Sequence, residues 1–254
     1  MVARGGGGLR LTSAHRPQRW TPDTRFGVWF QNTTVWRRYV LTLALDGFEQ
    51  LLGSATPRPK VLLDAGCGAG QAFEGIAARF RPERILAVDI DRRQLDLARR
   101  SAAQCSCPVE LQHADLRRLD LRNESVDLAL CHQVLHHVSD QEAVLAELFR
   151  VLRPGGFLLV AESCRAFVRS LPVRLLFRHP HGVQRSAEGY RELLRASGFA
   201  FERESTSTPD PFWARPDFGL RERLGLPRAQ GEAPEVQVVA RRPARALLPQ
   251  WTSA

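Results

Sequence analysis

The sequence of 254 residues predicts a doubly wound α/β fold, in which helices cover both faces of a largely parallel sheet. Three observations support this prediction. Short apolar runs alternate with helical patterns between residues 60 and 161, as expected of successive parallel βαβ units with right-handed crossovers. A glycine-rich run, Gly66–Gly70, joins the first apolar run to the first helical pattern. The apolar residues of 140–152 recur at helical spacing.

Five strands and three helices are expected in this central region. The strands are Lys60–Asp64, Arg84–Asp89, Val109–His113, Val126–Cys131 and Phe157–Ala161. The helices are Gly70–Phe80, Arg92–Gln104 and Asp140–Leu152. Asp140 suits the N-cap of the third helix, and the Pro-Gly-Gly run 154–156 ends it, because proline breaks the helix and glycine accepts positive φ.

The C-terminal third departs from this alternation. A helix is expected over Glu188–Ser197, followed by strands at Phe199–Thr206 and Glu235–Ala240 that form an antiparallel pair at one sheet edge. Between the two strands, Pro209–Pro227 combines aromatic residues with prolines and predicts a structured loop. The result is a seven-stranded sheet, mostly parallel, with one antiparallel edge strand.

The N-terminal part is expected to lie outside the sheet. Residues 1–20 are rich in Gly and Arg without the apolar stretch of a signal peptide, so a disordered tail is expected. Residues 21–56 are expected to form a helical cap, in which Phe26–Leu52 carries aromatic residues. Aromatic residues at helical spacing usually pack on their own domain, so most of these are expected to be ordinary core. Residues 57–254 would form the main domain.

Composition limits the classes of protein that fit. No apolar run approaches the ~20 residues that cross a bilayer, so no transmembrane segment is expected. Five cysteines, an odd number, without a secretory signal predict reduced thiols and a cytoplasmic location. Cys105 and Cys107 lack a second pair at zinc-finger spacing, and no metal is expected there.

The net charge of +9 is unevenly distributed along the chain. Residues 1–60, 61–162 and 163–254 carry +6, −3 and +6, and Lys60 is the only lysine among 36 basic residues. The basic excess therefore belongs to the flanks, which would frame a substrate. It indicates either a partner such as nucleic acid or an arginine-biased composition.

The glycine run indicates where a ligand binds. Glycines let the backbone turn sharply and lie against a ligand at the strand ends of an open α/β sheet. Counted from Gly66 and Gly68, the third glycine of a dinucleotide fingerprint would fall on Gln71, and the Lys-Ser/Thr of a P-loop is absent. The ligand is therefore expected to lack a pyrophosphate. Asp89, 23 residues after Gly66, can accept hydrogen bonds from a ribose diol, although nucleotide dehydrogenases use the same device.

Five motifs in order resemble those of class I S-adenosylmethionine-dependent methyltransferases, and are most similar to the ubiquinone/menaquinone-biosynthesis and natural-product group. They are Asp64–Gly70, Ala87–Asp91, Ala114–Leu116, Ser125–Leu128 with Leu135–Val138, and Arg150–Gly156. The resemblance covers residues 60–161 and extends weakly into the last helix and strands. It implies a Rossmann-like fold with a cofactor core over 60–162, and substrate-side insertions at about 165–185 and 208–230.

The resemblance also implies site residues for S-adenosylmethionine. Gly66, Cys67 and Gly68 would contact its methionine part through their backbone, with Gly70 completing the loop, and Asp64 would orient this loop or reach the ammonium. Further along the chain, Asp89 with Ile90 would bind the ribose, Asp115 and Leu116 the adenine, and Cys131 and His132 would lie beside the sulfonium.

Structural alternatives stand beside these roles. The glycine run fits a plain strand-to-helix turn, and Asp89 or Asp115 fits a helix cap. His132 and His136 share a face if a helix begins after the fourth strand, and either could be a general base for a substrate proton. A metal role for the histidines is not expected, because no acidic partner is evident at the positions where the resembling family binds metal. His137 is expected to be structural, and His179 and His181 lie in a basic loop within reach of a substrate cleft.

The expected function is transfer of a methyl group to a small organic acceptor, acidic or aromatic, with the enzyme mainly positioning the reactants. Nucleic acid is not the expected partner, because no RNA-binding module is visible. An RNA or protein methyltransferase and a non-catalytic S-adenosylmethionine-binding protein remain the alternatives. The acceptor, its methylated atom and the oligomeric state do not follow from the sequence.

Overall fold

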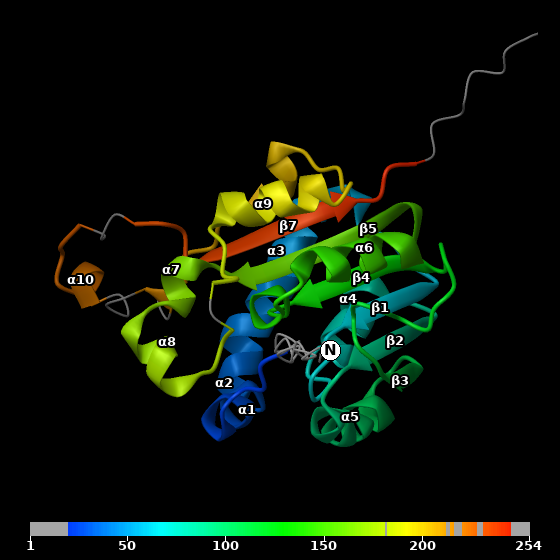
Figure 1. The fold of residues 1–254 in the computed structure, drawn as a ribbon, viewed down its shortest axis with the longest axis horizontal. Helices are drawn as coiled ribbons and strands as arrows, with labels where there is room; N and C mark the ends of the chain where they lie inside the picture. Colours follow the sequence, from blue (N-terminus) through cyan, green and yellow to red (C-terminus); the bar gives the residue numbers. More distant parts are fainter. Residues whose placement is uncertain (1–19, 181, 212–213, 216–219, 228–230, 245–254) are drawn as a thin grey trace, which may run out of the picture.

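The computed structural model describes residues 20–180, 182–211, 214–215, 220–227 and 231–244. Its described residues contain a seven-stranded sheet in the order β3-β2-β1-β4-β5-β7-β6 (Figure 1). The strands are β1 (Val61–Ala65), β2 (Arg84–Asp89), β3 (Val109–His113), β4 (Val126–His132), β5 (Leu152–Ser163), β6 (Thr206–Ser207) and β7 (Glu235–Arg241). The predicted fold class is confirmed.

The sheet pairing creates a strand-end crevice. Strands β1 to β5 are parallel, β7 pairs antiparallel with β5, and the short edge strand β6 pairs antiparallel with β7. The chain adds β2 and β3 on one side of β1 and then returns to place β4 on the other side. Ligands of open α/β sheets bind at such a switch point, beyond the carboxyl ends of the strands.

Helices cover both faces of the sheet (Figure 1). The α-helices are α1 (Arg25–Gln31), α2 (Thr34–Trp36), α3 (Thr42–Leu52), α4 (Phe73–Phe80), α5 (Arg92–Gln104), α6 (Gln141–Val151), α7 (Arg165–Val168), α8 (Leu171–Leu176), α9 (Ala187–Ala196) and α10 (Leu220–Arg223). The π or 3-10 turns are η1 (Arg37–Leu41), η2 (Gly53–Ala55), η3 (Leu135–His137) and η4 (Arg203–Ser205). Helices α3, α4 and α5 share one hydrophobic core with the sheet, and α6 and α9 share the other.

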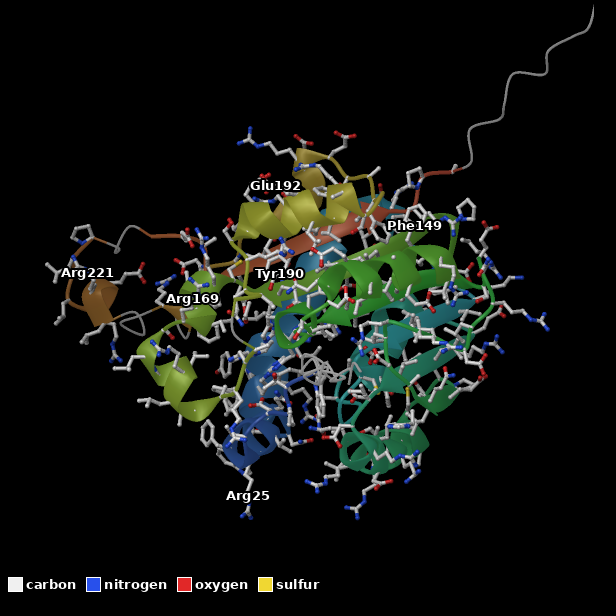
Figure 2. The ribbon with its side chains drawn as sticks, in the orientation of Figure 1. Arg25, Phe149, Arg169, Tyr190, Glu192 and Arg221 are labelled. Carbon is white, nitrogen blue, oxygen red and sulfur yellow. The ribbon has the colours of Figure 1, made fainter. Side chains whose placement is uncertain are left out.

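Side-chain alternation along the strands supplies these two cores. In β1, Leu63 belongs to the core under α6 and α9, and its neighbour Leu62 to the core under α3 and α4. Both are fully buried, as expected for a parallel strand covered on two faces. Tyr190 of α9 and Phe149 of α6 extend this packing between helices and sheet (Figure 2).

The expected continuous helix over Phe26–Leu52 is interrupted. The Thr33 hydroxyl accepts a hydrogen bond from the Trp36 amide at 3.2 Å and thereby starts α2 as a new helix. Next comes the π turn η1, where the Thr42 hydroxyl donates to the Arg37 carbonyl at 2.8 Å. The backbone stays right-handed helical from Thr34 through η1 to Leu52, so the break at Asn32 and Thr33 is the one that separates α1 from the rest of this segment. Residues of α1 and α2 line the cavity at the strand ends.

Two other elements differ from the sequence-based expectation. Gly70 has a φ of +74° and belongs to a turn, so α4 begins at Phe73. The strand expected over Phe199–Thr206 is mostly wrong: Ala200 forms an isolated bridge, and η4 intervenes before β6, because this segment is charged and mostly exposed. Residues 1–19, most of the expected tail, and parts of the 208–230 insertion lie outside the described residues.

Among the residues that the structure describes, none of the helices has the length and apolar character needed to cross a bilayer.

Candidate functional site

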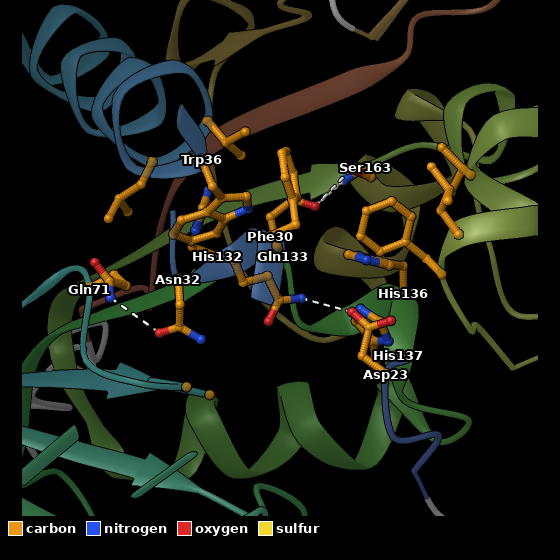
Figure 3. Close-up of a pocket in the computed structure, with 18 of the residues that line it drawn as sticks. Asp23, Phe30, Asn32, Trp36, Gln71, His132, Gln133, His136, His137 and Ser163 are labelled. Atoms are coloured by element: carbon orange, nitrogen blue, oxygen red, sulfur yellow. Dashed lines mark hydrogen bonds between the residues drawn. The ribbon is translucent and has the colours of Figure 1, made fainter. Parts of the chain in front are cut away.

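A cavity of about 550 Å³ lies at the carboxyl ends of β1 and β4, under α1, α2, α7 and α8 (Figure 3). A recess of about 140 Å³ adjoins it at the ends of β2 and β3. The two spaces share the loop residues Gly66 and Gly68, together with Gln133 and His137. The site is therefore divided into a larger aromatic part and a smaller recess, lined by apolar side chains and by Asp89, Asp91 and Asp115, and the two are joined at the glycine loop.

The glycine loop uses its amides to hold its own shape. The Gly66 and Cys67 amides donate to the Val88 carbonyl at 2.8 and 3.0 Å, and the Gly68 amide donates to Asp89 Oδ2 at 2.8 Å. These three amides are thus bound within the protein, unlike the free amides of a phosphate cradle. Gly68 has a φ of +52°, and no atom lies within 4 Å of where its Cβ would be, so its open side faces the cavity.

Gly66 is required for packing as well as for φ. Its φ is +81°, and an added Cβ would lie 2.6 Å from Val134 Cγ2. Gly155 is a matched control, because its φ is +82° but no atom lies within 4 Å of its added Cβ. Gly66→Ala should therefore lower the free energy of unfolding by about 1–3 kcal/mol more than Gly155→Ala in urea titrations. Equal losses of unfolding free energy in the two variants would show that the loop moves away from Val134 at no energetic cost.

Asp64 brings a buried carboxyl group to the cavity. It lies in β1, is 3% exposed, and its Oδ2 has no hydrogen-bond partner. Burial, together with the nearby Asp89, raises the pKa of Asp64 to about 7. A buried acid without a partner is costly to the fold, and a cationic or hydrogen-bond-donating group of a ligand would offset that cost.

The other two predicted acids are already engaged. Asp89 accepts from the Gly68 amide through Oδ2 and from the Asp91 amide through Oδ1, both at 2.8 Å. Burial raises the pKa of Asp89 in spite of these bonds. Asp115 forms an ion pair with Arg117 at 2.5 Å, yet it lines the recess together with Ile90 and the buried Leu116.

The structure does not bring every predicted residue to the cavity. The Cys131 side chain is fully buried in the core of the sheet and does not line either space. Gly70 does not line them either; an added Cβ would lie 2.3 Å from the Phe73 ring, so it serves the turn. Cys67 does line the cavity, and its thiol has a pKa raised far above the ordinary value, mainly by burial.

His132 ends β4 and lines the cavity. Its ring packs edge-on against Trp36 at a centroid distance of 5.6 Å, and its buried Nε2 has no hydrogen-bond partner (Figure 3). Burial and the neighbouring His136 lower the pKa of His132 to about 3. His132 is therefore neutral near pH 7 and suited to hydrogen bonding; so low a pKa makes it a weak general base.

His136 and Glu162 form a buried pair. His136 Nδ1 lies 2.7 Å from Glu162 Oε2, and Glu162 also accepts from the amides of Val134 and Leu135, each at 2.8 Å. Glu162 is fully buried in β5. It therefore holds η3 against the end of the sheet and orients the His136 ring.

The aromatic part of the cavity differs from the sequence-based expectation. Most N-terminal aromatic residues were expected to be ordinary core, but Phe26, Phe30, Trp36 and Tyr39 line the cavity. Phe177 packs edge-on against Phe26 and Phe30, at centroid distances of 5.7 and 6.0 Å. Aromatic residues that pack on a core and those that line a cavity have the same helical spacing, so the sequence pattern does not distinguish them. The break around Thr33, which the spacing does not reveal, determines which of them face the cavity.

The sheet order, the glycine loop after β1 and the acid at the end of β2 define a Rossmann-like domain that binds a nucleoside-bearing ligand at its strand ends. Residues 63–160 match the family model of a methyltransferase domain.

Relatives and solved structures agree with that match. The malonyl-[acyl-carrier protein] O-methyltransferase of Serratia marcescens is 36% identical over 130 residues, covering 51% of this chain and 49% of that protein. The ubiquinone biosynthesis O-methyltransferase of Rhizobium rhizogenes is 27% identical over 185 residues, covering 72% and 74%. The S-adenosylmethionine dependent methyltransferase structure from Mesorhizobium loti has a TM-score of 0.54 at 22% identity, covering 78% and 100%.

Residues 63–160 therefore correspond to a methyltransferase domain, and the chain is similar to S-adenosylmethionine-dependent methyltransferases, whose cofactor is S-adenosylmethionine. It spans about half or less of the length of several curated relatives that it matches.

Proposed function

We propose that the protein binds S-adenosylmethionine at the glycine loop and transfers its methyl group to a small apolar or aromatic acceptor held in the larger cavity. The observation that carries this proposal is the buried Asp64 carboxyl group, whose Oδ2 has no partner and which lines the cavity beside Gly68. The methionine part of the cofactor carries an ammonium group, which is the kind of partner that such a carboxylate lacks.

The remaining residues fit the rest of the cofactor. Asp89 borders the recess with lone pairs left for a ribose diol after its two backbone bonds. Leu116 and Ile90 offer apolar surface for the adenine ring in the same recess. When bound, the cofactor supplies an already activated methyl group. The protein's contribution is then to align the acceptor and exclude water, and the aromatic walls of the cavity are suited to both.

The cavity lining favours an apolar or aromatic acceptor over an acidic one. Arg215 is the only arginine or lysine among the described lining residues, and its guanidinium pairs with Asp210 at 3.1 Å and with Glu222. Surface arginines such as Arg25 and Arg169 point outward (Figure 2). In the described part of the flanks, the arginines therefore lie mostly outside the space where we place the acceptor.

Calorimetry with S-adenosylhomocysteine tests the proposal. The wild-type protein should bind it with a Kd in roughly the micromolar range, and Asp89→Ala should weaken binding about 10- to 100-fold, because a charge-assisted hydrogen bond contributes roughly 1.5–3 kcal/mol. Asp120→Ala is the matched control, since Asp120 is exposed and does not line either space. No binding by the wild type, or equal binding by both variants, would contradict the proposal.

The acceptor is then sought with a library of small molecules, with release of S-adenosylhomocysteine as the readout. Planar apolar compounds should be methylated faster than acidic compounds of the same size. Methyl transfer to bulk RNA or protein, without transfer to any small molecule, would contradict a small-molecule acceptor and support an RNA or protein methyltransferase.

A further inference from the structure

Three histidine side chains meet at the wall of the cavity. His136 and His137 come from η3, and His179 comes from the segment after α8, 42 residues later in the sequence. Their ring centroids are 4.3, 5.1 and 4.8 Å apart, and one nitrogen from each ring lies within 4.8 Å of the other two. All three line the larger cavity, where His136 and His137 are also seen in Figure 3.

The donor atoms that the cluster offers are all imidazole nitrogens, one from each ring. Neutral imidazole nitrogens are typical ligands of zinc and of other late divalent transition metals.

Carboxylates complete the surroundings of the cluster. Glu162 Oε2 lies 2.7 Å from His136 Nδ1, which leaves His136 Nε2 as the nitrogen available to a ligand. A metal-binding histidine commonly donates its other ring nitrogen to a carboxylate in this way. Asp23 also lines the cavity and interacts electrostatically with His136, so two acidic side chains lie near enough to offset a double positive charge.

We propose that His136, His137 and His179 bind one divalent transition-metal ion of the zinc type, oriented by Glu162. Two nitrogens on a tetrahedral zinc ion lie about 3.3 Å apart, so the rings would move together by about 1.5 Å at most on binding. Three protein ligands leave a fourth position open. Because the cluster lines the cavity, that position is available to water or, if the proposed function holds, to an oxygen atom of the acceptor.

Titration of metal-free protein with Zn²⁺ tests the site by calorimetry, and Co²⁺ tests it by the visible absorption of a tetrahedral complex. We expect saturation at about one ion per chain. His179→Ala should weaken binding at least about 100-fold, and Glu162→Gln about 10- to 100-fold. His113→Ala is the matched control, because His113 is exposed and its Nε2 contacts the Ile90 carbonyl.

Two results would overturn the metal site: no saturable uptake of Zn²⁺ or Co²⁺ by the wild type, or equal uptake by His179→Ala and His113→Ala. If Glu162→Gln fails to fold, the comparison of these two histidine variants still decides. S-adenosylhomocysteine affinity is measured in parallel and should not change in His179→Ala. The two readouts separate the two proposals. A wild-type protein that binds S-adenosylhomocysteine but no metal contradicts the metal site alone, and one that binds metal but no S-adenosylhomocysteine contradicts the proposed function alone.

Discussion

Asp64→Asn is expected to stabilise the folded protein and, at the same time, to abolish most of its affinity for S-adenosylhomocysteine. Both effects arise because Asp64 is buried, has an Oδ2 without a partner and has a pKa raised from 3.8 to about 7. In the unbound protein, ionised Asp64 is a cost to folding. In the complex that we propose, it would be the partner of the ligand's ammonium group.

The pH dependence of stability has a definite sign. The folded state holds the Asp64 proton up to about pH 7, whereas the unfolded state releases it near the ordinary value of 3.8. This group therefore makes the protein lose stability as the pH rises from about 4 to 7, and the full cost remains above pH 7. Asp64→Asn removes that cost, which is at most about 4 kcal/mol at pH 8.

The pH dependence of binding has the opposite sign. The ammonium group binds the ionised form, so affinity of the wild type should rise about tenfold between pH 6 and pH 8. Asp64→Asn should bind weakly and lack this rise. Urea unfolding and calorimetry at both pH values measure the two effects, with Asp96→Asn as a control whose carboxylate is exposed and paired with Arg99. If Asp64→Asn neither gains stability nor loses affinity, Asp64 is not the residue that binds the ligand's ammonium group.

Glu162→Ala is expected to lower the free energy of unfolding by roughly 3–5 kcal/mol. Glu162 is fully buried and accepts from the amides of Val134 and Leu135 as well as pairing with His136. Alanine would leave these donors in the interior without an acceptor, and a buried donor without a partner costs about 1–3 kcal/mol. Because η3 would lose its anchor, the wall of the cavity should loosen as well.

Urea titration measures the loss, and hydrogen exchange at the amides of Val134 and Leu135 locates it. Glu162→Gln keeps one carbonyl oxygen as an acceptor and should be less destabilised than Glu162→Ala. Glu110→Ala should cost under about 1 kcal/mol, because Glu110 is exposed and its pairing with Arg84 at 3.5 Å lies at the surface. A loss for Glu162→Ala as small as that for Glu110→Ala would contradict the role of Glu162 as an anchor.

Much of the fold was predictable because its signals are local. The strands β1 to β5 and the helices α5, α6 and α9 follow from apolar runs, helical spacing and caps such as Asp140, which accepts from the Ala143 amide at 3.1 Å. The glycine loop was predictable for a similar reason, since a strand end followed by glycines has few other conformations. The segment after Phe199 was mispredicted because its alternation is weak and its few apolar residues do not require a strand.

The sequence by itself determined the order of elements, the loop Gly66–Gly70 and the acids that end β1 and β2, because each depends on residues close together in the chain. The tertiary structure alone decided which side chains share the cavity. It placed Cys131 in the core, Trp36 against His132, and His179 beside His136 and His137. Such contacts depend on where the breaks at Thr33 and the turns around α8 direct distant segments, and no local pattern encodes that direction.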